Sequence, residues 1–233
     1  MTTNLKTEVL KEDPGDIDLS FKLIVIGDSF VGKSCLTIKA TKGVFEDNYN
    51  PTIGFEFQTF YTKIEDSSIK LQIWDTCGQE VYRSLIGSFY HNSSLAILVY
   101  SIENKNSFDS LETWLNEIKT KGSPDINIFL IGNKADLEDK REITKKMAED
   151  FCKNHSIDFF LETSAKTGFN AENVFIEAAK LLYKQQLEYK ERYSRPDSLN
   201  NIINSQNTDD KNIILENNGE TEEDEKPRKK KCC

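Results

Sequence analysis

The sequence lacks any apolar run near the roughly 20 residues that a helix needs to span a bilayer. Its opening residues, MTTNLKTEVLKEDPGD, also lack the apolar stretch of a secretory signal. The five cysteines are odd in number and irregular in spacing, which argues against a disulfide framework, and no C-x-x-C pair offers a zinc site. We therefore expect the chain to fold in the reducing cytosol, where any membrane contact depends on an attached group.

An excess of positive charge is also missing. The chain has 30 Lys and Arg residues against 39 Asp and Glu residues, a formal net charge of −9. General nucleic-acid binders usually carry a basic surface, so we expect no nucleic-acid partner. The length of 233 residues and the hydrophobic fraction of 37% suit one globular domain diluted by polar tails.

The chain divides into three predicted segments. Residues 1–17 are polar and contain Pro14-Gly15, which indicates a flexible N-terminal extension. Residues 18–188 have the periodic patterns of a folded domain. Residues 189–233 are rich in Asn, Ser, Asp and Glu and cannot bury enough apolar surface to offset their ordering entropy, so a disordered tail is expected.

Within the predicted domain, short apolar runs alternate with helical stretches. The expected strands are 21–26, 55–64, 68–74, 95–102, 126–132 and 158–163, and the expected helices are 33–42, 107–121, 143–154 and 170–188. The second and third strands read as an antiparallel hairpin. This alternation predicts an α/β fold with a six-stranded, mostly parallel sheet and helices on both faces, whose ligands bind at the carboxyl ends of the strands.

The strongest motif is GDSFVGKS at residues 27–34, which follows a predicted strand and opens a predicted helix. That context matches the phosphate loop G-x-x-x-x-G-K-[ST], in which backbone N–H groups and a helix N-terminus surround phosphate oxygens. We predict that Lys33 reaches the β- and γ-phosphates and that the Ser34 hydroxyl binds Mg²⁺. The alternative is a chance glycine-rich turn. The predicted phosphate contacts are Ser29, Phe30, Val31, Gly32, Lys33, Ser34 and Cys35.

The choice of base is predicted to lie in Asn133-Lys134-Ala135-Asp136, which follows an expected strand. The Asp136 carboxylate can accept hydrogen bonds from the ring N–H and the exocyclic amine of guanine, a donor pair that adenine lacks. Asp136 therefore argues against a P-loop ATPase or kinase. The stem of Lys134 can lie along the base, and Ser164-Ala165-Lys166 supply backbone contacts to the guanine carbonyl. Taken alone, either short motif could be a polar turn.

Two further motifs address the γ-phosphate. In WDTCGQE, Asp75 can hold Mg²⁺ through a water molecule, and Gly78 lets a backbone N–H approach the γ-phosphate closely. Gln79 can orient the water that attacks this phosphate. In NPTIG, the Thr52 hydroxyl can complete the Mg²⁺ shell once a γ-phosphate is present. A plain proline turn is the alternative for this second motif.

The order GDSFVGKS, PTIG, WDTCGQE, NKAD and ETSAK resembles the Ras-like small GTPases over about residues 20–188. Within them, IGFEF and KLQIWDTCGQEVYRSL resemble the first and second switches of the Rab family. The resemblance implies that Phe45 stacks on the guanine edge and that Tyr49 covers the phosphates. It also implies an effector-reading aromatic triad, for which ordinary core packing is the alternative. The triad is Phe57, Trp74 and Phe89.

The end of the chain, KPRKKKCC, resembles the doubly geranylgeranylated end of Rab proteins at Cys232 and Cys233. Two prenyl chains give stable anchoring where one is marginal, although the acidic run Glu222–Glu225 opposes the basic cluster. Two idle thiols are the alternative. The resemblance implies a monomeric G domain on the cytoplasmic face of endomembranes, with a cytosolic pool. The implied partners are effectors, an exchange factor, an activating protein, a prenylation escort and a GDP-dissociation inhibitor.

Several residues depart from the Rab pattern, and Val81-Tyr82 and His91-Asn92, which replace Arg-Phe and Arg-Gly, leave nucleotide binding intact. Phe30 stands where Rab proteins usually carry Gly, Ala or Ser, so its side chain must point out of the phosphate loop, and Cys77 replaces Ala. The expected function is a Rab-type GTP/GDP switch that hydrolyses GTP slowly with Mg²⁺ and regulates vesicle traffic. The alternative is a GTP-binding, effector-recruiting module in which Phe30 and Cys77 impair hydrolysis. The presence of Gln79 favours the hydrolysing switch.

Overall fold

The structure, a computed structural model, describes residues 5–45, 54–76, 90–157 and 159–193. The chain divides into two compact units, Met1–Lys190 and Glu191–Cys233. The first unit holds the α/β fold and all the described residues up to position 190.

Within the described residues, seven strands form one sheet in the order β1-β3-β4-β2-β5-β6-β7. The strand β2 pairs in parallel with β4 and β5, and the parallel arrangement continues through β6 to β7. The pairs β3–β4 and β1–β3 are antiparallel. The predicted mixed, mostly parallel α/β fold is confirmed. The strands are β1 (Thr7–Leu10), β2 (Leu19–Ile26), β3 (Phe55–Ile64), β4 (Ser67–Thr76), β5 (Leu95–Ser101), β6 (Asn127–Asn133) and β7 (Phe159–Glu162).

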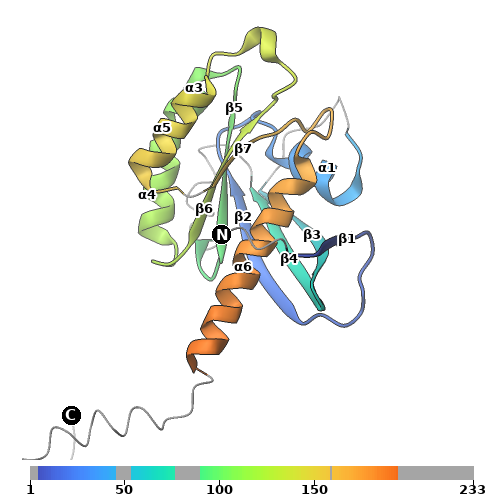
Figure 1. Cartoon of the computed structure of the whole chain (residues 1–233). Helices are drawn as coiled ribbons and strands as arrows, with labels where there is room; N and C mark the ends of the chain where they lie inside the picture. Colours follow the sequence, from blue (N-terminus) through green and yellow to red (C-terminus); the bar gives the residue numbers. More distant parts are fainter. Residues whose placement is uncertain (1–4, 46–53, 77–89, 158, 194–233) are drawn as a thin grey trace, which may run out of the picture. The chain divides into compact units, whose positions relative to one another are not determined.

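Helices cover both faces of this sheet (Figure 1). Alternate residues of β2 point to opposite faces: Leu23 and Val25 join one apolar cluster, and Ile24 and Ile26 join the other. The first cluster includes buried residues of α1 and α6, and the second includes those of α4 and α5. The helices are α1 (Lys33–Lys42), α3 (Lys105–Asp109), α4 (Leu111–Lys121), α5 (Lys145–His155) and α6 (Ala171–Tyr193), with a short 3₁₀ helix, η2 (Glu138–Lys140).

Two predicted helix boundaries were wrong. The single helix expected at 107–121 is two helices, and α3 begins earlier because the Asn104 side chain accepts a hydrogen bond from the backbone N–H of Ser107. The last helix continues to Tyr193, past the expected end at 188. Its final turns are rich in Lys, Glu, Gln and Arg, which sustain a helix by intrinsic propensity without an apolar face to mark it in the sequence.

The prediction that residues 1–17 form a flexible extension was wrong for β1, and the sheet gains a seventh strand as a result. Thr7–Leu10 pair antiparallel with Tyr61–Ile64 at the edge of the sheet. The Thr62 hydroxyl donates to the Glu8 carbonyl at 2.8 Å, and the side chains of Leu5 and Val9 pack against the core cluster of α6. The strand Thr7–Leu10 is only four residues long, which is too short a pattern to be recognised in the sequence alone.

The rest of this N-terminal segment is held by polar contacts. The Lys11 ammonium lies 2.6 Å from Glu172 Oε1 at the start of α6, and the Tyr61 hydroxyl donates to Asp13 Oδ2 at 2.8 Å. These contacts are exposed and contribute little individually. The backbone pairing with β3 and the packing of Leu5 and Val9 therefore hold the strand in place. None of the helices in the described ranges combines the length and apolar composition needed to cross a membrane.

Replacing Val9 by Asp should lower the free energy of unfolding by about 1–2 kcal/mol, because a carboxylate would enter a half-buried apolar site. The neighbouring Glu8 is exposed and lies opposite Lys63, so the charge-removing Glu8→Gln should change the free energy of unfolding by less than about 0.5 kcal/mol. Urea denaturation followed by tryptophan fluorescence compares the two variants with the wild type. If the extension were flexible, neither substitution would change the free energy of unfolding.

Candidate functional site

The phosphate-loop sequence connects β2 to α1, as its motif predicts. Gly27 and Gly32 have φ values of 140° and 90°, a region that favours glycine. A Cβ atom at Gly27 would lie 2.1 Å from the Val99 carbonyl oxygen, and one at Gly32 would lie 2.5 Å from Asn133 Nδ2. The two glycines therefore let the loop curl tightly against the ends of β5 and β6.

Phe30 also adopts a left-handed conformation, with φ of 64°, and 78% of its surface is exposed. The expectation that this bulky side chain points out of the loop is confirmed. Val31, next to it, is instead buried in the core cluster, while Ser29 and Cys35 are half-buried. The loop thus keeps its inner side free of the aromatic ring.

The Lys33 side chain is buried and folds back over the loop. Its Nζ atom donates to the carbonyl oxygens of Gly27 at 2.9 Å and Asp28 at 2.8 Å. The ammonium group therefore lies inside the curl of the loop, where a phosphate needs a positive charge. Trp114 of α4 was missed in the sequence: its Nε1 donates to Asp28 Oδ1 at 2.7 Å and fixes the loop to the helix layer.

Ser34 and Asp75 meet on the other side of the loop, where the Ser34 hydroxyl donates to Asp75 Oδ2. Asp75 is 1% exposed, and burial raises its pKa to about 7 although the Ser34 hydrogen bond and the Lys33 charge act in the opposite direction. Its second oxygen, Oδ1, is buried without a hydrogen-bond partner among the described residues. A buried, unsatisfied carboxylate oxygen is costly unless something else neutralises it.

This pair suits Mg²⁺. A hydroxyl and a carboxylate are hard oxygen ligands, and Mg²⁺ is usually held by one or two protein groups together with phosphates and water. The described part of the chain contains no group of three or more His, Cys, Asp and Glu side chains that could hold a metal by themselves. A cation at Ser34 and Asp75 would therefore need further ligands beyond these two side chains, such as phosphate oxygens and water.

Asn133 joins this loop to the two base-reading motifs. Its Nδ2 donates to the carbonyls of Val31 at 2.9 Å and Gly32 at 3.3 Å. Its Oδ1 accepts from the Thr163 hydroxyl at 3.1 Å and the Ala165 N–H at 3.2 Å. Because the side chain is 1% exposed, none of these bonds can be replaced by bulk water.

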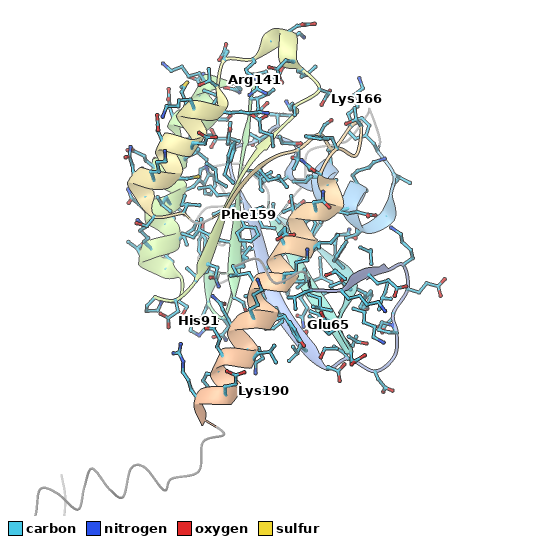
Figure 2. The ribbon with its side chains drawn as sticks, viewed as in Figure 1. Glu65, His91, Arg141, Phe159, Lys166 and Lys190 are labelled. Atoms are coloured by element: carbon cyan, nitrogen blue, oxygen red, sulfur yellow. The ribbon has the colours of Figure 1, made fainter. Side chains whose placement is uncertain are left out.

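The residues predicted to read the base lie beside this junction. The Asp136 carboxylate is exposed, and its Oδ1 accepts from the Ser164 hydroxyl at 2.5 Å. Lys134 has a φ of 64°, and its Nζ lies 2.8 Å from Oε1 of Glu103, which follows β5. Sequence reasoning missed Glu103, because a single exposed-looking carboxylate after a strand carries no recognisable signal. Lys166 is exposed at the same end of the domain as Arg141, opposite to His91 (Figure 2).

An aromatic surface lies on β3 and β4, and we define it as Phe55, Phe57 and Trp74. The Trp74 ring centroid is 5.4 Å from that of Phe55 and 5.3 Å from that of Phe57. Phe55 and Phe57 are 50% and 47% exposed, so neither is an ordinary core residue. Phe57 and Trp74 were singled out in the sequence, whereas Phe55 was missed although the same motif contains it. Phe45, by contrast, is half-buried against the core.

The remaining predicted residues lie outside the described ranges, and their roles stay predictions. They are Tyr49, Thr52, Gly78, Gln79, Phe89, Cys232 and Cys233, together with Cys77.

A family model described as the Ras family matches residues 22–184, well over half of the chain. The match begins inside β2 and ends inside α6. It therefore covers the phosphate loop, the Ser34–Asp75 pair and both base-reading motifs, and it excludes β1 and the C-terminal segment.

Replacing Asn133 by Asp should lower the free energy of unfolding by about 3 kcal/mol, because a buried carboxylate would face the carbonyls of Val31 and Gly32 with no proton to donate. The exposed Asn106, in the first turn of α3, offers a matched control, and Asn106→Asp should cost less than about 0.5 kcal/mol. Denaturant titration of the nucleotide-free proteins measures both. Similar values for the two variants would contradict a structural junction at Asn133.

Proposed function

The chain belongs to the Ras family of small GTPases, and from that premise we propose that it is a Rab-type GTP/GDP switch that regulates intracellular vesicle traffic. The observation that carries the proposal is the aromatic surface of Phe55, Phe57 and Trp74. Large exposed apolar side chains that touch one another mark a protein-binding surface more than a folding requirement. The surface occupies the positions that resemble the Rab first switch and the strand before the second.

The phosphate loop and its neighbours account for nucleotide binding. We infer that loop N–H groups and the N-terminus of α1 hold the phosphates, and that Lys33 exchanges its carbonyl partners for β- and γ-phosphate oxygens. Ser34 and Asp75 would hold Mg²⁺, which when bound neutralises charge on the phosphates. Asp136 would accept the two guanine donors while Ser164 fixes its orientation.

Hydrolysis is proposed to be slow. Gln79 is assigned to orient the attacking water, and no arginine is assigned to the γ-phosphate from within the chain, which corresponds to an intrinsic rate of about 10⁻⁴ to 10⁻² s⁻¹. An activating protein would then set the lifetime of the GTP-bound form, and an exchange factor would restore the GTP-bound form after hydrolysis. The alternative, a module with impaired hydrolysis, rests partly on Phe30. The outward position of that ring leaves the phosphate side of the loop clear, and Gln79 favours the hydrolysing switch.

We also propose that the chain is anchored by two geranylgeranyl groups on Cys232 and Cys233. These would place it on the cytoplasmic face of endomembranes, while a prenylation escort and a GDP-dissociation inhibitor maintain a cytosolic pool. The support is the terminal Cys-Cys and the basic residues that precede it.

In a single-turnover assay, the wild-type protein should convert bound GTP to GDP, and Gln79→Leu should slow that step at least tenfold. The reason is that leucine cannot hydrogen-bond the attacking water. Gln72→Leu is a matched control, because Gln72 lies on β4 and bonds Ser20 at 2.8 Å, away from the phosphate loop. Its rate should stay within about twofold of wild type. No measurable turnover by the wild type would favour the impaired module, and an unchanged Gln79→Leu rate would assign the water to another group.

Incubation with Rab geranylgeranyl transferase and geranylgeranyl diphosphate should add two prenyl groups to the protein, only when an escort protein is present. Intact-mass spectrometry reads the number of groups directly. The double variant Cys232→Ser/Cys233→Ser should gain none and remain in the cytosolic fraction of cells, because without a lipid chain only the basic cluster is left, and the acidic run Glu222–Glu225 opposes it. Prenylation without an escort, or sedimentation of the double variant with membranes after a high-salt wash, would contradict the Rab assignment of this end.

A further inference from the structure

Arg141 is the most fully bonded charged side chain near the base-reading motifs. Its Nε and Nη2 donate to the two carboxylate oxygens of Glu138 at 2.8 and 2.6 Å. Its Nη1 and Nη2 donate to the two oxygens of Glu162 at 2.6 and 3.0 Å. Nη1 also reaches the Ile143 carbonyl at 2.8 Å. All five N–H donors of the guanidinium are thereby used.

The two carboxylates belong to different base-reading segments. Glu138 is in η2, two residues after Asp136, whereas Glu162 ends β7, two residues before Ser164. Arg141 therefore bridges the segment that carries the predicted base carboxylate and the segment that carries the predicted carbonyl contacts. Figure 2 places it at the same end of the domain as Lys166.

The bridge is fixed on the inner side and open on the outer side. The Arg141 and Glu162 side chains are 14% and 7% exposed, whereas Glu138 is 68% exposed. The chain after Arg141 is fixed as well, since the N–H groups of Glu142 and Ile143 both donate to the Ile102 carbonyl at 2.9 and 3.0 Å. If Arg141 moved, we therefore expect the exposed segment of Glu138 and Asp136 to shift more than the strands of the sheet.

We expect the ion pairs of Arg141 with Glu138 and Glu162 to fix the orientation of the two segments more than to add stability. Buried ion pairs often add little net stability, because desolvation offsets their attraction, but two parallel hydrogen bonds to each carboxylate fix a geometry. Lysine has a single charged atom and cannot bond both carboxylates in this way. Base recognition is sensitive to such geometry, since hydrogen bonds weaken steeply when their distance and angle depart from the preferred values.

We propose that Arg141 is a positioning residue for guanine recognition. By bridging Glu138 and Glu162, it sets the separation between Asp136 and residues 164–166 into which the base fits. Arg141 itself does not touch the base. The proposal depends on the guanine-nucleotide binding of the family and is independent of the Rab assignment.

The test compares GDP with IDP, whose base lacks the exocyclic amine that is expected to donate a hydrogen bond to the Asp136 carboxylate. The affinities of GDP, IDP and GMP are measured by their ability to displace a fluorescent GDP from the protein. The variants are Arg141→Gln, Arg141→Lys and Glu162→Gln. The preference for GDP over IDP should fall about tenfold in Arg141→Gln and Glu162→Gln, and Arg141→Lys should restore it only in part. The preference for GDP over GMP should stay unchanged, because the β-phosphate contacts belong to the loop of Lys33.

Two variants set the scale. Asp136→Asn should abolish the preference for GDP over IDP and supplies the reference for complete loss. Lys145→Gln is the matched control: its ammonium lies 3.6 Å from Glu162, but its side chain is 69% exposed, so no change is expected. Equal loss of GDP and IDP affinity in Arg141→Gln would make Arg141 a structural residue and overturn the proposal, as would an unchanged preference. If Asp136→Asn has no effect, the base is read elsewhere, which overturns the proposal on a different ground.

Discussion

The buried carboxamide of Asn133 is the junction on which the arrangement of the site depends. It donates to two carbonyls of the phosphate loop and accepts from the segment after β7, while its own backbone ends β6. A carboxamide can donate and accept at once, whereas a carboxylate or an ammonium of similar size can do only one. The segments predicted to bind phosphate and to read the base are consequently joined through this one side chain.

The topology explains why a single side chain can do this. The strands β2, β5, β6 and β7 are parallel, so their carboxyl ends lie along one rim and the loops that follow them are neighbours. Gly27 and Gly32 then let the phosphate loop approach β5 and Asn133 more closely than any residue with a Cβ could. The glycines of the motif thus serve the packing of the loop against the sheet as well as the approach of a phosphate.

Sequence alone predicted the parts of this structure that depend on local pattern. The short apolar runs of β2, β5 and β6 identified the buried strands of the sheet, and the spacing within GDSFVGKS placed the loop between a strand and a helix. The missed features depend on pairings between distant residues. The strand β1 exists because it pairs with Tyr61–Ile64, and the role of Arg141 depends on its ion pair with Glu162. Each looks like ordinary polar sequence until the fold brings its partner into contact.

The hairpin of β3 and β4 links the proposed partner surface to the nucleotide. Phe57 is the register partner of Trp74, and Phe55 is that of Thr76, the last residue of β4. The Thr76 hydroxyl donates to the Val25 carbonyl at 2.8 Å, and the preceding Asp75 meets Ser34, so this end of β4 is fixed to the phosphate loop. Both segments assigned to the γ-phosphate, one ending before β3 and one starting after β4, therefore join the sheet at adjacent positions. A partner that binds the aromatic surface would contact Phe55 directly, and Phe55 is the register partner of the buried Thr76, which is fixed to the phosphate loop.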